Sequence, residues 1–104
     1  MRLRNLEIDT NELAKLCKKW SIARIEVFGS ALRDDFGPES DIDLLVSFQP
    51  EAHVGLFQMD LAEAELSRLF GRKVDLVSRR GIEASENWIR KQDILSSAVQ
   101  VFAA

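Results

Sequence analysis

With 104 residues and a formal net charge of −3, the chain is long enough for one compact core and too acidic for broad nucleic-acid binding. Affinity for phosphate backbones comes mainly from clustered Lys and Arg, so we expect no stable nucleic-acid partner. No apolar run reaches the roughly 18 residues of a membrane span, and the start of the chain has no signal-peptide core. We therefore expect one cytoplasmic domain over residues 1–104, without a membrane partner and with homo-oligomers as an option.

The first predicted element is an amphipathic helix over residues 9–20. Its apolar side chains follow the i, i+3, i+4, i+7 spacing of one helix face, at Leu13, Leu16, Cys17 and Trp20. Asp9, Thr10 or Asn11 could supply the N-cap. Cys17 is the single cysteine of the chain and forms no internal disulfide, and its place on the apolar face predicts a core residue.

Two strands are predicted next, joined by a short helix and a loop. Residues 24–28 alternate polar and apolar side chains and end at Gly29, after which a brief helix begins near Ser30. Residues 36–40 have the composition of a loop. They lead into residues 41–48, which form the clearest strand pattern of the sequence.

The second half of the chain is expected to add a helix, a strand and a last helix. Residues 56–70 repeat apolar positions every three or four residues, and Gly71 lies where a helix C-cap is expected. Residues 73–77 form a third short strand, and residues 83–97 follow as a helix. The buried anchors expected for this last helix are Trp88, Ile89 and Leu95. Residues 99–102 fit either a continuation of that helix or an edge strand.

This order of elements describes a small α/β (α+β) fold with a β-sheet flanked by helices. The first two strands are joined by only a short helix and a loop. We therefore expect a mixed sheet rather than a purely parallel one.

Paired carboxylates mark the second strand. Side chains at i and i+2 of a strand point to one face, so Asp41 and Asp43 project together, roughly 7 Å apart, while Ile42 and Leu44 face the core. The two carboxylates repel each other, and Mg²⁺, which prefers carboxylate and phosphate oxygens, would relieve that repulsion. Asp75 repeats the pattern in the third strand. Three carboxylates on one sheet face suit metal-assisted phosphoryl transfer, and aspartates that merely line an exposed sheet face are the alternative.

The second candidate feature is the turn between the first strand and the short helix. Free backbone N–H groups at such a junction favour phosphate, and Gly29 allows a close approach of the backbone. Ser30 could donate its hydroxyl to a phosphate oxygen, and Arg33, one helical turn later, could neutralise the charge. A plain helix N-cap is the alternative for this turn.

Several other nucleotide and metal motifs are absent from the sequence. There is no G-x-x-x-x-G-K-[ST] loop and no G-x-G-x-x-G turn. A lone cysteine and the lone His53, which we expect at the surface, offer no zinc cluster. The basic pairs at residues 72–73 and 79–80 flank the third strand, and they fit either solvated surface or a contact with phosphate or a partner.

Two sequence strings resemble the signature of a known superfamily. They are GSALR at residues 29–33 and SDIDLLV at residues 40–46. Together they resemble the G-S-x-x-R and S-D-x-D-L-hydrophobic signature of DNA polymerase β-like nucleotidyltransferases. The string VDLV at residues 74–77 is similar to the third-aspartate strand of minimal nucleotidyltransferase (MNT) domains. The resemblance covers residues 22–77, and it departs at Asp34, where many relatives have glycine.

The resemblance implies a nucleotidyltransferase palm-like fold and a set of site residues. The nucleotide-binding residues would be Gly29, Ser30 and Arg33. The metal-binding and catalytic residues would be Asp41, Asp43 and Asp75, with one or two Mg²⁺ ions as cofactor and ATP as substrate. Within this triad, Asp75 would help to activate the attacking hydroxyl.

The resemblance also implies a partner. Similar MNT domains act as antitoxins of HEPN-domain ribonuclease toxins and transfer AMP from ATP to a toxin tyrosine, which is the leading hypothesis for this chain. The short chain leaves little room for an acceptor pocket, so the acceptor would come from the partner. The alternatives are a non-catalytic module that neutralises its partner by binding, and nucleotidyl transfer to a small molecule. The sequence does not distinguish ATP from other nucleotides, or one added AMP from several.

Overall fold

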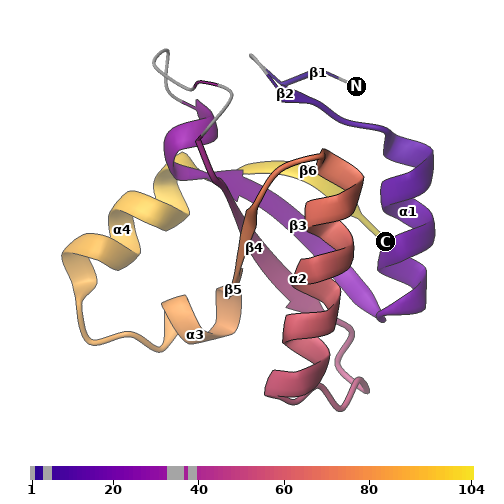
Figure 1. Ribbon diagram of the computed structural model, residues 1–104. Helices are drawn as coiled ribbons and strands as arrows, with labels where there is room; N and C mark the ends of the chain where they lie inside the picture. Colours follow the sequence, from indigo (N-terminus) through magenta and orange to yellow (C-terminus); the bar gives the residue numbers. More distant parts are fainter. Residues whose placement is uncertain (1, 4–5, 33–36, 38–39) are drawn as a thin grey trace.

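The computed structural model describes residues 2–3, 6–32, 37 and 40–104, and it places helices on both faces of a four-stranded sheet (Figure 1). The elements in chain order are β1 (Arg2–Leu3), β2 (Leu6–Glu7), α1 (Thr10–Lys19), β3 (Ile22–Phe28), the 3₁₀ helix η1 (Gly29–Leu32), β4 (Ile42–Phe48), α2 (Leu56–Phe70), β5 (Val74–Ser78), α3 (Arg79–Glu83), α4 (Trp88–Ser97) and β6 (Val99–Ala103). The small antiparallel hairpin of β1 and β2 is an addition that the sequence patterns did not predict.

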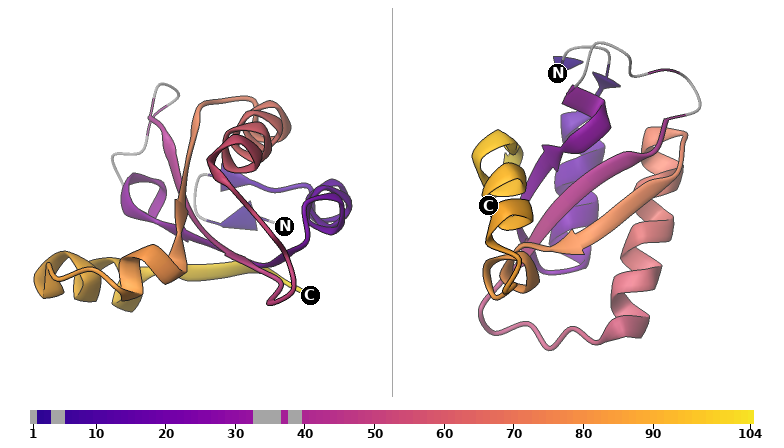
Figure 2. Two further views of the ribbon diagram at one scale, coloured as in Figure 1. Left: turned by 90° about the horizontal axis from the view of Figure 1, so that it is seen from below. Right: turned by 90° about the vertical axis from the view of Figure 1, so that its left-hand side faces the viewer.

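The sheet has the strand order β5-β4-β3-β6 and is mixed, as predicted. β3 pairs antiparallel with both β4 and β6, whereas β4 and β5 are parallel. A parallel pair needs a crossover connection, and α2 provides it between β4 and β5. Figure 2 shows α1 and α2 on one side of the sheet and α4 on the other. This arrangement confirms the expected α/β class with a mixed sheet flanked by helices.

The main hydrophobic core lies between the sheet and the helices α1 and α2. Ile42, Leu44 and Val46 alternate along β4 and are almost completely buried. The helical residues that share this core with them are Leu13, Cys17, Ala62 and Leu66. Burial of Cys17 confirms its assignment to the core. Because alternate residues of β4 face this core, Asp43 points to the opposite face of the sheet.

A smaller core covers part of that opposite face. It consists of Phe28 of β3, Leu45 of β4, Ile82 of α3 and Ile94 of α4. The strand residues of this second core come from both central strands, and the two short helices close over them. The C-terminal helices are thereby fixed beside the strand ends that carry the aspartates.

Most predicted helices and strands occur within two residues of their expected bounds. Asp9 caps α1, and its Oδ1 accepts a hydrogen bond from the backbone N–H of Glu12 at 3.1 Å. α2 has the predicted bounds, and Gly71 ends it with a left-handed φ of 69°. Residues 99–102, which the sequence left open, belong to the edge strand β6. The predicted loop over residues 36–40 lies largely outside the described residues.

The last predicted helix is wrong in its extent and in its buried face. Residues 83–97 are not one helix, because α3 ends at Glu83 and α4 begins only after Asn87, whose side chain caps it. Trp88 and Ile89, expected as anchors, are 68% and 59% exposed, and Ile94 is the buried anchor instead. Leu95 is partly buried beside it. The contacts of Ile94 with the second core show which face of α4 packs on the sheet. Within the described part of the chain, no helix is long and apolar enough to cross a membrane.

Candidate functional site

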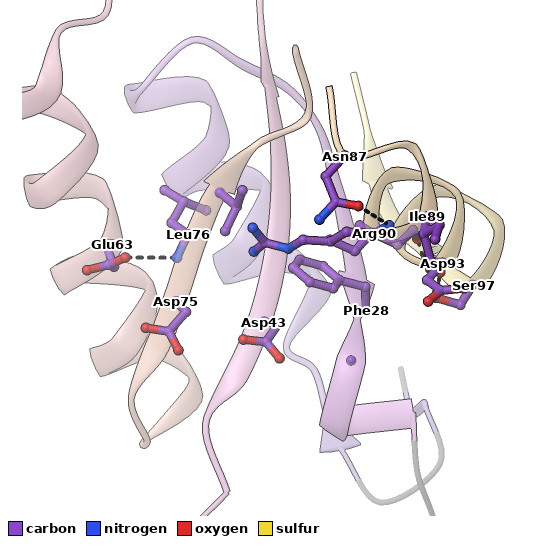
Figure 3. Close-up of a pocket in the computed structure, with 13 residues that line it drawn as sticks. Phe28, Asp43, Glu63, Asp75, Leu76, Asn87, Ile89, Arg90, Asp93 and Ser97 are labelled. Carbon is purple, nitrogen blue, oxygen red and sulfur yellow. Dashed lines mark hydrogen bonds between the residues drawn. The ribbon is translucent and has the colours of Figure 1, made fainter. Parts of the chain in front are cut away.

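Two of the predicted aspartates lie next to each other on adjacent strands. In the parallel register of β4 and β5, Asp43 is paired with Asp75, and in the antiparallel register of β3 and β4, Phe28 is paired with Asp43. Paired residues of neighbouring strands point to the same face. Figure 3 shows the carboxylates of Asp43 and Asp75 side by side, as the sequence predicted. Asp41 lies one residue before β4 begins.

Gly29 lies directly beside this carboxylate pair. It follows the last residue of β3 and starts η1, so the predicted order of strand, glycine and short helix is confirmed. Its φ of 72° is left-handed, and a Cβ atom added to it would lie 2.4 Å from Oδ2 of Asp43. Such contacts do not occur in proteins, so only glycine allows the Asp43 carboxylate to take this position.

The other two predicted nucleotide contacts are less fully described. The backbone of Ser30 belongs to η1, and its side chain is not among the described groups. Arg33 lies outside the described residues. The roles of both residues therefore stay predictions from the sequence.

Lys73 lies between two of the three predicted aspartates, Asp41 and Asp75. Lys73 Nζ lies 3.9 Å from Oδ2 of Asp41 and 4.0 Å from Oδ1 of Asp75. The side chains of Asp41 and Asp75 are 45% and 44% exposed. The ammonium group of Lys73 thus supplies positive charge beside Asp41 and Asp75, whereas the sequence predicted a metal ion that bridges Asp41 and Asp43.

The carboxylates of Asp43 and Asp75 line a cleft of about 890 Å³. One wall is the sheet, with Gly29, Asp43 and Asp75, and the other is formed mainly by α4. Figure 3 shows both walls and the side chains between them. A cleft of roughly 300–1,000 Å³ is the usual size of a small-molecule or cofactor site.

α2 seals the free edge of the sheet next to Asp75. The backbone N–H of Leu76 donates to Oε2 of Glu63 at 2.8 Å, and the backbone N–H of Val74 donates to Oγ of Ser67 at 3.0 Å. These bonds satisfy edge amides on either side of Asp75, which would otherwise be open to another strand. They hold the backbone that carries the Asp75 carboxylate.

Sequence reasoning missed the residues that α4 and α2 contribute to the cleft. The polar ones are Glu63, Asn87, Arg90, Asp93 and Ser97. Three of them, at residues 90, 93 and 97, recur at the spacing of one helix face, so the sequence contained a signal for a polar stripe. Periodicity does not tell whether such a stripe faces solvent or a site, and only the packing of α4 against the sheet decides it.

The donor set fits a metal ion that is held jointly with phosphates. Among the described residues, no group of three or more His, Cys, Asp or Glu side chains is gathered as a metal site. Mg²⁺ is usually bound by one or two carboxylates together with substrate phosphates rather than by an all-protein cage. The neighbouring carboxylates of Asp43 and Asp75, with the backbone of Gly29 beside them, match that chemistry.

Residues 11–101 match the nucleotidyltransferase domain model, and the chain belongs to this family. Two proteins of Methanocaldococcus jannaschii, both named as protein adenylyltransferases, are 34% identical over 67 residues and 38% identical over 69 residues. The matches cover 64% and 65% of this chain and 66% and 67% of the relatives. The chain therefore spans about two thirds of the length of these relatives.

Solved structures with the same fold include MNT proteins. A structure of a minimal nucleotidyltransferase is 30% identical, with a TM-score of 0.65 and 86% of each chain covered. A toxin–antitoxin structure with AMP-PNP has a TM-score of 0.69 at 20% identity, covering 93% of this chain and 75% of the other. A complex of tri-AMPylated Shewanella oneidensis HEPN toxin with MNT antitoxin has a TM-score of 0.60 at 21% identity, covering 91% and 70%. These likenesses agree with the MNT resemblance and the palm-like fold inferred from the sequence.

Proposed function

We propose that this chain is an Mg²⁺-dependent nucleotidyltransferase that transfers AMP from ATP to a tyrosine hydroxyl of a HEPN toxin, for which it serves as the antitoxin. The observation that supports this most strongly is the pairing of Asp43 with Asp75 beside Gly29. A carboxylate pair next to a backbone turn at the end of a strand suits a metal–nucleotide complex.

Each predicted site residue has a place in this proposal. Gly29, Ser30 and Arg33 bind the nucleotide phosphates. Asp41 and Asp43 bind Mg²⁺, which when bound neutralises phosphate charge. Asp75 completes the metal-binding triad and accepts the proton of the acceptor hydroxyl. The hydroxyl oxygen bonds to the α-phosphorus, the bond from that phosphorus to the oxygen bridging to the β-phosphate breaks, and pyrophosphate leaves.

The acceptor in this proposal is a protein. The side chain of Asp75, which lines the cleft, is 44% exposed, so this end of the cleft is open to a large molecule. The M. jannaschii relatives are named as protein adenylyltransferases, and the S. oneidensis complex contains an AMPylated HEPN toxin. Both names support a protein hydroxyl as the acceptor over a small molecule.

The test is AMP transfer to a HEPN protein encoded beside this chain. With ATP and Mg²⁺, the wild-type chain should add the mass of AMP to that protein, as measured by intact-mass spectrometry. Asp43→Asn should abolish the addition, because the amide keeps the size of the side chain and loses its charge. Asp60→Asn, on the exposed side of α2, is the matched control and should transfer AMP like the wild type.

Toxin neutralisation separates catalysis from simple binding. If the double variant Asp41→Asn, Asp43→Asn binds the toxin and still neutralises it, the chain acts as a non-catalytic antitoxin. If neither wild type nor Asp43→Asn changes the mass of the partner, the transferase proposal is rejected.

A further inference from the structure

The cleft is acidic apart from one side chain. Its charged lining residues are four acids and a single base, namely Asp43, Glu63, Asp75, Asp93 and Arg90 among the described residues. A nucleoside triphosphate carries several negative charges, and carboxylates at close range repel it unless cations intervene. Mg²⁺ would supply positive charge at the sheet wall. Arg90 supplies it from the opposite wall.

The fold holds the backbone of Arg90 firmly. Arg90 lies in the first turn of α4, and its backbone N–H donates to Oδ1 of Asn87 at 3.1 Å. Ile94, one turn further along, is buried against Phe28 and Leu45 and anchors the helix to the sheet. The start of α4 is therefore fixed relative to the strands that carry the aspartates.

The side chain of Arg90 is directed into the cleft and keeps its donors available. Figure 3 shows it extending from α4 toward β4, on the face of the sheet that carries Asp43 and Asp75. Among the described residues, no side chain forms a hydrogen bond or an ion pair with its guanidinium. An arginine that is held at an acidic cleft, and that has no side-chain partner in the described part of the chain, is suited to a ligand anion.

We propose that Arg90 binds the β- and γ-phosphates of the nucleoside triphosphate. In this arrangement the α-phosphorus lies beside Asp43 and Asp75, where the hydroxyl attacks, and the outer two phosphates extend toward the α4 wall. The planar guanidinium fork matches two phosphate oxygens at once. When the bond to the α-phosphorus breaks, its electron pair goes to pyrophosphate, and Arg90 stabilises that added charge. This inference rests on the nucleotide binding proposed above.

The test compares ligands with and without the outer phosphates. Isothermal titration calorimetry in Mg²⁺ would measure the dissociation constants of ATP, inorganic pyrophosphate and AMP for the wild type, Arg90→Gln and Arg90→Lys. Arg90→Gln should weaken ATP and pyrophosphate by about tenfold or more, because a charge-assisted hydrogen bond is lost. AMP should change less than about threefold, and Arg90→Lys should give intermediate losses because it keeps the charge without the fork.

Lys91→Gln is the matched control. Lys91 is the next residue of the same helix, and it faces a separate surface depression with Trp88 and Leu95. Lys91→Gln removes one positive charge, as Arg90→Gln does, and should leave all three dissociation constants unchanged. Circular dichroism would verify that every variant is folded. The inference is overturned if Arg90→Gln behaves like Lys91→Gln, or if it weakens AMP as much as ATP. If the wild type itself binds no ATP in Mg²⁺, the proposed function fails together with the inference.

Discussion

The position of one glycine determines whether the Asp43 carboxylate can face the cleft. Gly29 combines a left-handed backbone with a distance of 2.4 Å from its missing Cβ to Oδ2 of Asp43. The sequence predicted a functional role for this glycine, because a glycine in the turn allows the backbone to approach a phosphate closely. The structure adds a second reason, because the glycine also makes room for the Asp43 carboxylate on the adjacent strand β4.

Substitution of Gly29 should therefore damage the site more than the fold. Gly29→Ala should lower the free energy of unfolding by about 1 kcal/mol for the left-handed backbone and displace the Asp43 carboxylate. We expect AMP transfer to fall more than about tenfold, a loss of about 1.4 kcal/mol in transition-state stabilisation. Gly71→Ala is the control, since Gly71 has a φ of 69° but open space around its Cβ position. Gly71→Ala should lose as much stability as Gly29→Ala in urea unfolding and should keep its AMP-transfer activity. Equal losses of AMP transfer in both variants would contradict the prediction.

The buried cysteine predicts an alkaline dependence of stability. Burial raises the pKa of the Cys17 thiol from 9.0 to about 12. Between these values the unfolded chain releases the thiol proton and the folded chain keeps it, so the free energy of unfolding falls as the pH rises, by up to about 1.4 kcal/mol per pH unit. The chain contains no tyrosine that would titrate in the same range.

Urea unfolding at pH 8 and pH 10 would measure this dependence. Cys17→Ala should be less stable at pH 8 because it leaves a small cavity, and its stability should decline less between the two pH values. Identical declines in the wild type and Cys17→Ala would show that the thiol does not contribute.

At the scale of elements, a buried ion pair adds to the packing of Ile82 and links α3 to the sheet. Nη1 of Arg79 donates to both carboxylate oxygens of Glu26, at 2.6 and 2.7 Å. The side chain of Glu26 is only 8% exposed and that of Arg79 is 20% exposed. From the sequence, residue 79 fitted either a solvated surface or a contact with phosphate or a partner. The structure shows instead that Arg79 pairs with Glu26 within the chain. The pair lies where β5 passes into α3.

Removing one member of this pair should be costly. Arg79→Met should lower the free energy of unfolding by about 3 kcal/mol, because it removes both hydrogen bonds to the buried Glu26 carboxylate and leaves that carboxylate only the longer ion pair with Arg24, at 3.6 Å. Arg80→Met, at the exposed neighbouring position, should change stability by less than about 0.5 kcal/mol. Urea unfolding measures both. The double variant Glu26→Leu, Arg79→Met should recover much of the loss, and a double variant as unstable as Arg79→Met would argue against the charge as the cause.

At the scale of the whole molecule, the cleft joins the sheet to the C-terminal helices. Gly29 and Asp43 come from the first half of the chain, whereas Asp75 and the α4 residues come from the second. β6 then returns to pair with β3 in the centre of the sheet. Because β6 from the second half of the chain pairs with β3 from the first half, unfolding of either half should disrupt the site.

We therefore expect one cooperative unfolding transition, as predicted for a single domain over residues 1–104. Far-ultraviolet circular dichroism and tryptophan fluorescence should give the same midpoint. ATP with Mg²⁺ at 100 times its dissociation constant should stabilise the folded chain by about 2.7 kcal/mol and raise the melting temperature by roughly 10 °C or more. Asp43→Asn should show a much smaller shift under the same conditions. Two separate transitions would contradict the single domain.

The sequence by itself determined which face of the sheet carries the aspartates, because the features that mark this face are local. The alternation of side chains along residues 41–48 and 73–77 places the aspartates on one face and the core residues on the other. A glycine at the end of a strand indicates a turn whatever the rest of the chain packs against it. The register that sets Asp43 beside Asp75 and the orientation of α4 depend on contacts far apart in the chain. The prediction of Trp88 and Ile89 as anchors was wrong because the apolar residues of α4 mark more than one candidate face. The burial of Ile94 shows which of these faces packs on the sheet. Only the tertiary structure therefore placed Arg90 in the cleft.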